Sequence, residues 1–142
     1  MNTVADCRLI KLPKIAMPQG NITPVEGAST IPFRIARVFY LYDIPVDAAR
    51  GGHAHRQLEQ AIVCVMGSFD MVVDDGTSRR VVTLRRADEA LYVPTGIWGE
   101  LVNFSSGAVC FTLASIAYEE SDYLRTYEEF IEYRRSLADA AR

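Results

Sequence analysis

The chain has 142 residues, of which 49% are hydrophobic and 23% are charged, and its formal net charge is -3. This length and composition fit one globular domain over residues 1–142 with a sizeable buried core. Fifteen Lys and Arg residues against 18 Asp and Glu residues leave no broad basic face, so we expect no nucleic-acid partner. No segment is long and apolar enough to cross a bilayer, so we expect no membrane partner.

The first thirty residues are punctuated by prolines and glycines, a pattern that predicts two short strands with turns. The run RIARVFYLY, residues 34–42, is rich in β-branched and aromatic residues and predicts a strand. Side chains alternate across a strand, so Arg37 and Phe39 fall on one face and Tyr40 falls on the other.

Further short apolar runs with turn residues between them predict more strands, at residues 60–66, 69–73, 79–84, 90–93 and 108–114. Many short strands at this spacing are typical of an all-β barrel or sandwich. The end of the chain differs, because Thr126 and Glu129 form a capping-box pattern before residues with helical periodicity. We therefore expect one C-terminal helix that packs an apolar stripe on the barrel.

The cysteines are three in number and widely spaced along the chain, at Cys7, Cys64 and Cys110. Cys64 and Cys110 lie inside apolar strand-like runs, which indicates reduced core residues. Together with the absence of an apolar leader at the N-terminus, this predicts a cytoplasmic protein.

The chain contains two histidines, His53 and His55, directly after a pair of glycines. Alternate residues of a strand point to the same face, so both imidazoles should enter one cavity. Glu59 shares their parity if the strand continues without a bulge. This arrangement suits either a metal site or acid–base chemistry near neutral pH.

These residues resemble the two signature motifs of the cupin superfamily. HAHRQLEQAIVCVMG, residues 53–67, matches the first motif, and PTGIWGELVN, residues 94–103, matches the second except that Gly99 replaces the ligand histidine. Two histidines and the Glu59 carboxylate could still bind iron, so a metal site stays open. The missing third histidine favours metal-free acid–base chemistry.

A narrower resemblance is to the WxcM-like dTDP-sugar 3,4-ketoisomerases. It is carried by IPFRIARVFYLYDIP, RGGHAHRQLEQAIVCVMGSFDMVVDDG, LYVPTGIWGELVNFSSGAVCFTLAS and YEESDYLRTYEEF. The resemblance implies a cupin-like β-barrel or jelly roll that converts dTDP-4-keto-6-deoxyglucose into a 3-keto sugar without metal or organic cofactor. It also implies a homodimer in which N-terminal strands are exchanged.

The resemblance further implies roles for individual residues. His53 aligns with the catalytic base, and His55 would shuttle the second proton or orient His53, although the two roles could be exchanged. Tyr40 aligns with an active-site tyrosine that could protonate or bind the sugar oxygens. Moving a ketone from C4 to C3 needs such a base and a proton donor on either side of an enediolate.

Six residues are candidates for substrate binding. Arg37 lies in an apolar strand, where a charge is costly unless it is used, and Arg50 could bind a phosphate. Adjacent residues of a strand point to opposite faces, so only one of Gln60 and its neighbour Glu59 can contact the sugar. The remaining candidates are Trp98 for the thymine or sugar, Arg125 for the nucleotide end, and Gln19 in the pocket.

Gln19 and Gly99 differ from the residues that are common at these two positions in the family. The resemblance implies that the residues at these positions correlate with the configuration at C4 of the product. The product could therefore be of the gluco or the galacto type. Three other functions compete with ketoisomerisation: epimerisation of the same keto sugar, a metal-dependent cupin oxygenase, and a module that binds a nucleotide sugar without turnover.

Overall fold

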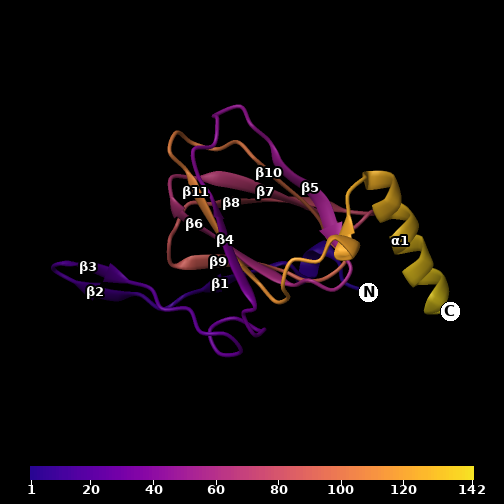
Figure 1. Ribbon diagram of the computed structural model, residues 1–142, viewed down its shortest axis with the longest axis horizontal. Coiled ribbons are helices and arrows are strands. Elements are labelled where there is room, and N and C mark those ends of the chain that lie inside the picture. Colours follow the sequence, from indigo (N-terminus) through magenta and orange to yellow (C-terminus); the bar gives the residue numbers. More distant parts are fainter.

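Two five-stranded antiparallel sheets face each other in the computed structural model, which describes residues 1–142 (Figure 1). The first sheet has the order β1 (Arg8–Lys11), β9 (Glu89–Val93), β6 (Gln60–Met66), β11 (Val109–Ala114), β4 (Arg37–Leu41). The second has the order β12 (Tyr123–Leu124), β5 (Arg50–His55), β10 (Trp98–Val102), β7 (Phe69–Asp74), β8 (Arg79–Leu84). The two sheets enclose the core, and the sequence prediction of an all-β domain is confirmed.

The main core is a cluster of 15 buried residues, most of which occupy the alternating inward positions of both sheets. Phe69, Leu84 and Leu91 are among its largest fully buried side chains. Cys7, Cys64 and Cys110 are also buried there as free thiols, as expected for the last two. No helix has the length and apolar character needed to span a bilayer.

Most predicted strands are present, with two differences that matter for the site. β4 is shorter than the predicted run of residues 34–42 and begins at Arg37. The segment containing Trp98, for which no strand was predicted, is the strand β10, which pairs with both β5 and β7. The short 3-10 helices η1 (Val4–Asp6) and η2 (Glu120–Asp122) complete the inventory outside the C-terminal helix.

The C-terminal helix α1 (Tyr127–Ala140) begins as predicted, because the Thr126 hydroxyl accepts a hydrogen bond from the backbone N–H of Glu129 at 3.2 Å. Its fully buried Phe130 packs with Ala54, Trp98 and Leu124 in a separate apolar cluster. Ala54 lies between the two histidines, so this cluster fixes the strand that carries them from the side opposite their rings.

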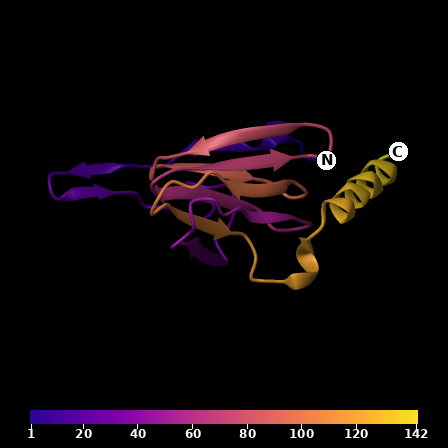
Figure 2. The ribbon, with the colours of Figure 1, turned by 90° about the horizontal axis from the view of Figure 1, so that it is seen from above.

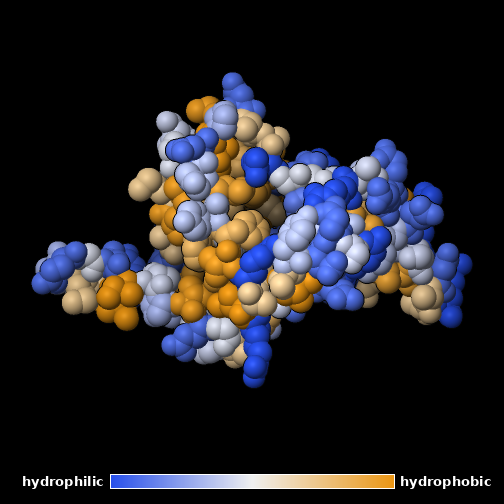
Figure 3. Space-filling model, in the orientation of Figure 1, coloured by the Kyte–Doolittle hydropathy of each residue, from blue (hydrophilic) through white to orange (hydrophobic).

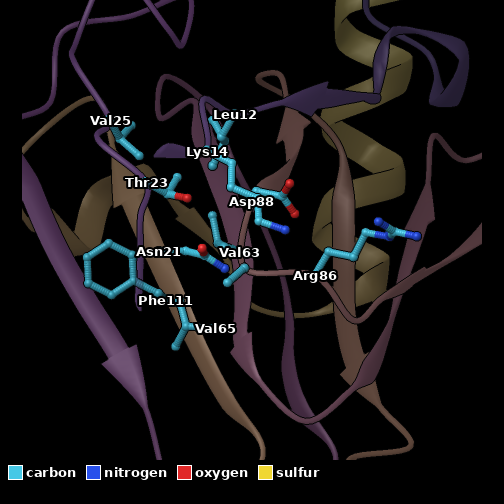
Figure 4. A pocket seen from close by; sticks show the side chains of 11 residues that line it. Leu12, Lys14, Asn21, Thr23, Val25, Val63, Val65, Arg86, Asp88 and Phe111 are labelled. Atoms are coloured by element: carbon cyan, nitrogen blue, oxygen red, sulfur yellow. The ribbon is translucent and has the colours of Figure 1, made fainter. Parts of the chain in front are cut away.

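The N-terminal region forms three strands rather than two, and the second and third make a hairpin of β2 (Ile15–Met17) and β3 (Gly20–Ile22). This hairpin projects away from the barrel in both views (Figures 1 and 2). Its apolar side chains Ile15, Met17 and Ile22 are about half exposed, at 49%, 48% and 53%. A hollow of about 530 Å³ lies where the hairpin joins the barrel, between Asn21 and Phe111 (Figure 4).

Candidate active site

A cavity of about 250 Å³ lies between the two sheets and contains both histidines. Strands β4, β6 and β11 supply one wall, and β5, β7, β10 and β12 supply the other. The wall nearest the core is apolar and includes Ile62, Met71 and Leu101. The polar side chains are therefore confined to a few positions, as is usual for a small-molecule site.

The local backbone brings the two imidazoles together. Gly51 and Gly52 adopt φ angles of 84° and 78°, a conformation that favours glycine, and the chain then becomes extended through His53 and His55. The two rings point into the cavity with centroids 4.9 Å apart in an edge-to-face arrangement. The predicted placement of both imidazoles in one cavity is thus what the structure shows.

Asp122 holds the second imidazole in one orientation. Its carboxylate lies 3.1 Å from His55 Nδ1 and also accepts the backbone N–H groups of Gln57 at 2.6 Å and Leu58 at 3.2 Å. Asp122 is 5% exposed. Because an ionised carboxylate only accepts hydrogen bonds, His55 Nδ1 carries the proton and Nε2 is left as a free acceptor.

Tyr123 lies beside both imidazoles. It is the antiparallel register partner of His55, and its ring centroid is 4.4 Å from that of His55 and 5.1 Å from that of His53. The guanidinium of Arg125 lies over the same ring at 4.1 Å from the centroid. The short strand β12 therefore places a phenol and a cation at the mouth of the cavity.

The pKa values of both histidines are shifted downward. Burial lowers the pKa of His53 to about 4, and the neighbouring His55 imidazole and the Arg125 guanidinium act in the same direction. Burial also lowers the pKa of His55, although its contact with the Asp122 carboxylate opposes the shift. Both imidazoles are consequently neutral near pH 7, the form in which they can accept a proton.

Three arginines give the cavity a positive rim. Arg37 lies against the rings of Phe39 and Tyr118, and its buried Nε has no hydrogen-bond partner. Arg50 lines the cavity without forming an ion pair, and Arg125 is paired with Glu120 through two hydrogen bonds of 2.6 and 2.7 Å. Such a rim is suited to an anionic ligand, because guanidinium groups bind phosphate oxygens in a bidentate manner.

Gln60 lines the cavity, whereas Glu59 points away from it and accepts a hydrogen bond from the Tyr92 hydroxyl. The expectation that Glu59 shares the histidines' face fails because β5 ends at His55 and the chain turns before β6 begins. The Glu59 carboxylate is therefore not beside the two histidines. No group of three or more His, Cys, Asp or Glu side chains is placed to hold a metal ion.

Residues 5–135 match the family model described as FdtA: WxcM-like, C-terminal. The chain belongs to this family. Over 126 residues it is 40% identical to the TDP-4-oxo-6-deoxy-alpha-D-glucose-3,4-oxoisomerase of Aneurinibacillus thermoaerophilus, a match that covers 89% of this chain and 91% of that protein.

Solved structures of sugar 3,4-ketoisomerases share the fold. QdtA, a sugar 3,4-ketoisomerase from Thermoanaerobacterium thermosaccharolyticum in complex with TDP, matches with a TM-score of 0.90 and 34% identity over 92% of this chain and 96% of that one. The TDP-quinovose 3,4-ketoisomerase WlaRB from Campylobacter jejuni matches with a TM-score of 0.86 and 36% identity over 89% and 98% of the respective chains. These matches confirm the predicted cupin-like barrel with one C-terminal helix.

Two residues expected in the site of this WxcM-like protein lie elsewhere. Tyr40 is 58% exposed on the outer face of β4, because the alternation that turns Arg37 and Phe39 inward turns Tyr40 outward. Trp98 is 5% exposed and packs against Tyr127 and Phe130 of the helix instead of lining the cavity. Its neighbour in β10 faces the cavity, so Trp98 must face the helix.

Gln19 lies in the turn of the projecting hairpin, and the fold of one chain does not bring it to the cavity (Figure 1). Gly99 does line the cavity and is the register partner of His53. A Cβ atom at Gly99 would lie 2.5 Å from the terminal methyl of Met71. The flexible Met71 side chain thus occupies the space next to Gly99.

Sequence reasoning missed the parts played by Asp122 and Met71, and it placed Tyr123 with Arg125 at the nucleotide end rather than beside the histidines. Nothing local in the sequence links Asp122 to His55, 67 residues away in the chain. Met71 had no signal beyond its place in a predicted core strand.

The lowered pKa of His53 predicts an unusual pH profile. Activity that needs the neutral imidazole is retained as the pH falls below 6.5 and is lost only as the pH passes through the folded value of about 4. We expect the acidic limb of deuterium uptake at C3, the step that needs His53 alone, to lie near that value, and Arg125→Gln to move the limb upward by removing a neighbouring cation. The test is a pH–rate profile with circular dichroism at each pH, and a limb near 6.5 would contradict the assignment.

Proposed function

We propose that this protein is an isomerase that moves the ketone of dTDP-4-keto-6-deoxyglucose from C4 to C3 in the synthesis of dTDP-amino sugars. The observation that carries the proposal is the pair of neutral imidazoles of His53 and His55 in a cavity rimmed by arginines. The relative that is 40% identical is named as an oxoisomerase of a TDP-4-oxo-6-deoxy sugar, which supports the substrate class.

The chemistry starts with removal of the proton on C3, which is acidic because it lies next to the C4 ketone. His53 takes this proton, since its neutral ring faces the cavity and no carboxylate occupies its nitrogens. The electron pair of the C3–H bond then forms the C3–C4 double bond of an enediolate. His55, with Nε2 free, carries the hydroxyl proton from O3 to O4.

The three arginines bind the anionic substrate. Arg37 and Arg50 have no carboxylate partner and are available to the diphosphate or to the enediolate oxygen. Arg125 lies at the mouth of the cavity, and Gln60 is the amide positioned for a sugar hydroxyl. No organic cofactor enters this scheme.

The deciding experiment is NMR of the purified protein with dTDP-4-keto-6-deoxyglucose in deuterated water. Isomerisation moves the carbonyl signal from C4 to C3, whereas epimerisation introduces deuterium next to a ketone that stays at C4. Absence of any reaction would leave only a binding module, and activity lost to a chelator and restored by a metal would indicate a metal-dependent cupin. The H4–H5 coupling of the product distinguishes the gluco from the galacto configuration.

We also propose a homodimer in which the β2–β3 hairpins are exchanged. Ile15 and Ile22 are register partners on one face of a hairpin that has no partner in its own chain (Figures 1 and 2). Apolar residues gather over the barrel beside the hairpin (Figure 3). Among the exposed apolar side chains of the first sheet are Val38 and Tyr40 on β4 and Val65 on β6. Exchange would carry Gln19 of one protomer to the partner protomer, so that it could lie near the cavity of that partner.

Disruption of the hairpin face should therefore change the oligomeric state. We expect a dimer mass for the wild type in analytical ultracentrifugation and a monomer for Ile15→Asp with Ile22→Asp, because two charges would be buried without partners. Val81→Asp is the matched control, since Val81 is 59% exposed on the other sheet. A monomeric wild type, or a dimer that tolerates the double variant, would contradict the exchange.

The three free cysteines support a proposal for the cellular location of the protein. Cys7, Cys64 and Cys110 are buried without a disulfide, which is typical of proteins from a reducing compartment. We propose that the enzyme acts in the cytoplasm.

A further inference from the structure

The proposed reaction needs a group that delivers a proton to C4, a step for which the sequence predicted His55 as the carrier and Tyr40 as a further donor at the sugar oxygens. Tyr40 lies on the outer face of β4, and the inward position next to it is Phe39, which has no exchangeable proton. The hydroxyl that the sequence suggested for proton donation is thus outside the cavity.

The other polar groups that line the cavity are poor proton donors. Guanidinium groups do not give up a proton in this pH range, an aliphatic hydroxyl such as that of Thr112 holds its proton more tightly than a phenol, and a carboxamide is not an acid. His55 has its Nδ1 proton bound to Asp122 and an unprotonated Nε2. Among these groups Tyr123 is the one that offers a phenol hydroxyl, which can donate a proton.

We propose that Tyr123 is a catalytic residue, the general acid that protonates C4 of the enediolate. This inference rests on the proposed ketoisomerase function. Each proton is accounted for: His53 takes the proton from C3, Tyr123 gives one to C4, and His55 moves the hydroxyl proton from O3 to O4. The protonated His53 then returns a proton to the Tyr123 phenolate, so the cycle ends with all groups in their starting forms.

The position of Tyr123 fits this role. Its ring is next to His53, the proposed base, with centroids 5.1 Å apart, so the two groups can serve two bonded carbons of one sugar. Arg125 lies over the ring and would offset the negative charge that proton donation leaves on the phenol.

The backbone around Tyr123 is also fixed. Arg56 Nη1 donates hydrogen bonds to the carbonyls of Ser121 at 2.8 Å and Tyr123 at 3.0 Å, and the Arg56 N–H donates to the carbonyl of Asp122. The phenol is therefore held in place by the same segment that orients His55.

The test compares Tyr123→Phe with Tyr40→Phe, which removes the competing hydroxyl on the outer face. With dTDP-4-keto-6-deoxyglucose in deuterated water, NMR follows both turnover and the uptake of deuterium at C3 of the recovered substrate. We expect Tyr123→Phe to lower turnover by about 100-fold or more, the usual scale for a general acid. Deuterium uptake at C3 should continue, because His53 and the enediolate are intact, and Tyr40→Phe should match the wild type in both.

Several results would overturn the inference. Unchanged turnover in Tyr123→Phe would do so, as would an equal loss of turnover and deuterium uptake, which indicates a role before the enediolate. A single turnover of C3-deuterated substrate in ordinary water gives a third reading: deuterium found at C4 would mean that His53 alone carries the proton.

Controls separate folding and function from the role of the phenol. The melting temperature and dTDP affinity of Tyr123→Phe should match the wild type. Should they not, 3,5-difluorotyrosine at position 123 keeps the ring and should move the alkaline limb of kcat to lower pH, and an unmoved limb counts against Tyr123. If the wild type does not convert the sugar at all, the ketoisomerase function itself is refuted. If the wild type and Tyr123→Phe convert it equally well, the function stands and only the role of Tyr123 is refuted.

Discussion

His53→Ala should lower the turnover of dTDP-4-keto-6-deoxyglucose by at least about 100-fold, the usual loss when a general base is removed. The neutral ring of His53 faces the cavity, and burial keeps it in the proton-accepting form at pH 7. Without it, no other neutral imidazole is free of a carboxylate contact, because His55 is bound to Asp122. The measurement is a coupled or NMR assay of product formation under saturating substrate.

Deuterium exchange at C3 shows which histidine acts first. His53→Ala should abolish uptake of deuterium at C3, because no enediolate forms. His55→Ala should slow product formation while some uptake at C3 persists, since its task is the transfer between O3 and O4. The reverse pattern would exchange the two roles, and full turnover by His53→Ala would remove the imidazole pair from the mechanism.

Local patterns predicted the fold well because this fold is built from local rules. Short alternating runs gave the core strands β6, β7 and β8 close to their observed bounds, and the Thr126 cap gave the start of the helix. β10 was missed because Trp98 and Gly99 follow a proline-glycine turn and do not read as a strand. Its pairing with β5 and β7 supplies the order that local propensity lacks.

The candidate site was predicted in part. The alternation of side chains along a strand explains which site residues were predicted correctly and which were not. Alternation along one strand permits Arg37 or Tyr40 in the cavity but not both, and the structure selects Arg37. Parity could not be extended from His55 to Glu59, because the chain turns between two strands. Contacts across the fold, such as that of Asp122 with His55, have no local signature in a single sequence.

Asp122→Asn should lower turnover strongly by reversing the tautomer of His55. The carboxylate now accepts three donors, His55 Nδ1–H and the backbone N–H groups of Gln57 and Leu58. An asparagine has one acceptor oxygen, which the Gln57 N–H at 2.6 Å would keep, so the amide nitrogen replaces the oxygen that Leu58 N–H and His55 Nδ1 share. The amide N–H would then face His55 Nδ1. The ring would then carry its proton on Nε2 and could not accept one from O3.

The expected loss is about 100-fold or more, in line with the effect of a wrong histidine tautomer in other acid–base enzymes. With two histidines in the chain, ¹⁵N NMR of the imidazoles can report the tautomer of His55 directly. Asp75→Asn is the matched control, because Asp75 is equally buried and also accepts three donors, in its case the backbone N–H groups of Val4, Thr77 and Ser78, away from the cavity.

Both variants should lose stability to a similar extent, since each leaves buried backbone donors less well satisfied. Only Asp122→Asn should change the His55 resonances and the turnover. A loss of turnover with an unchanged tautomer would make Asp122 a support for the segment that carries Tyr123 rather than for the imidazole. Equal losses of turnover in both variants would mean that Asp122 acts on turnover through stability alone. Measuring turnover and the His55 tautomer together therefore separates the effect of Asp122 on the position of the proton from its effect on folding.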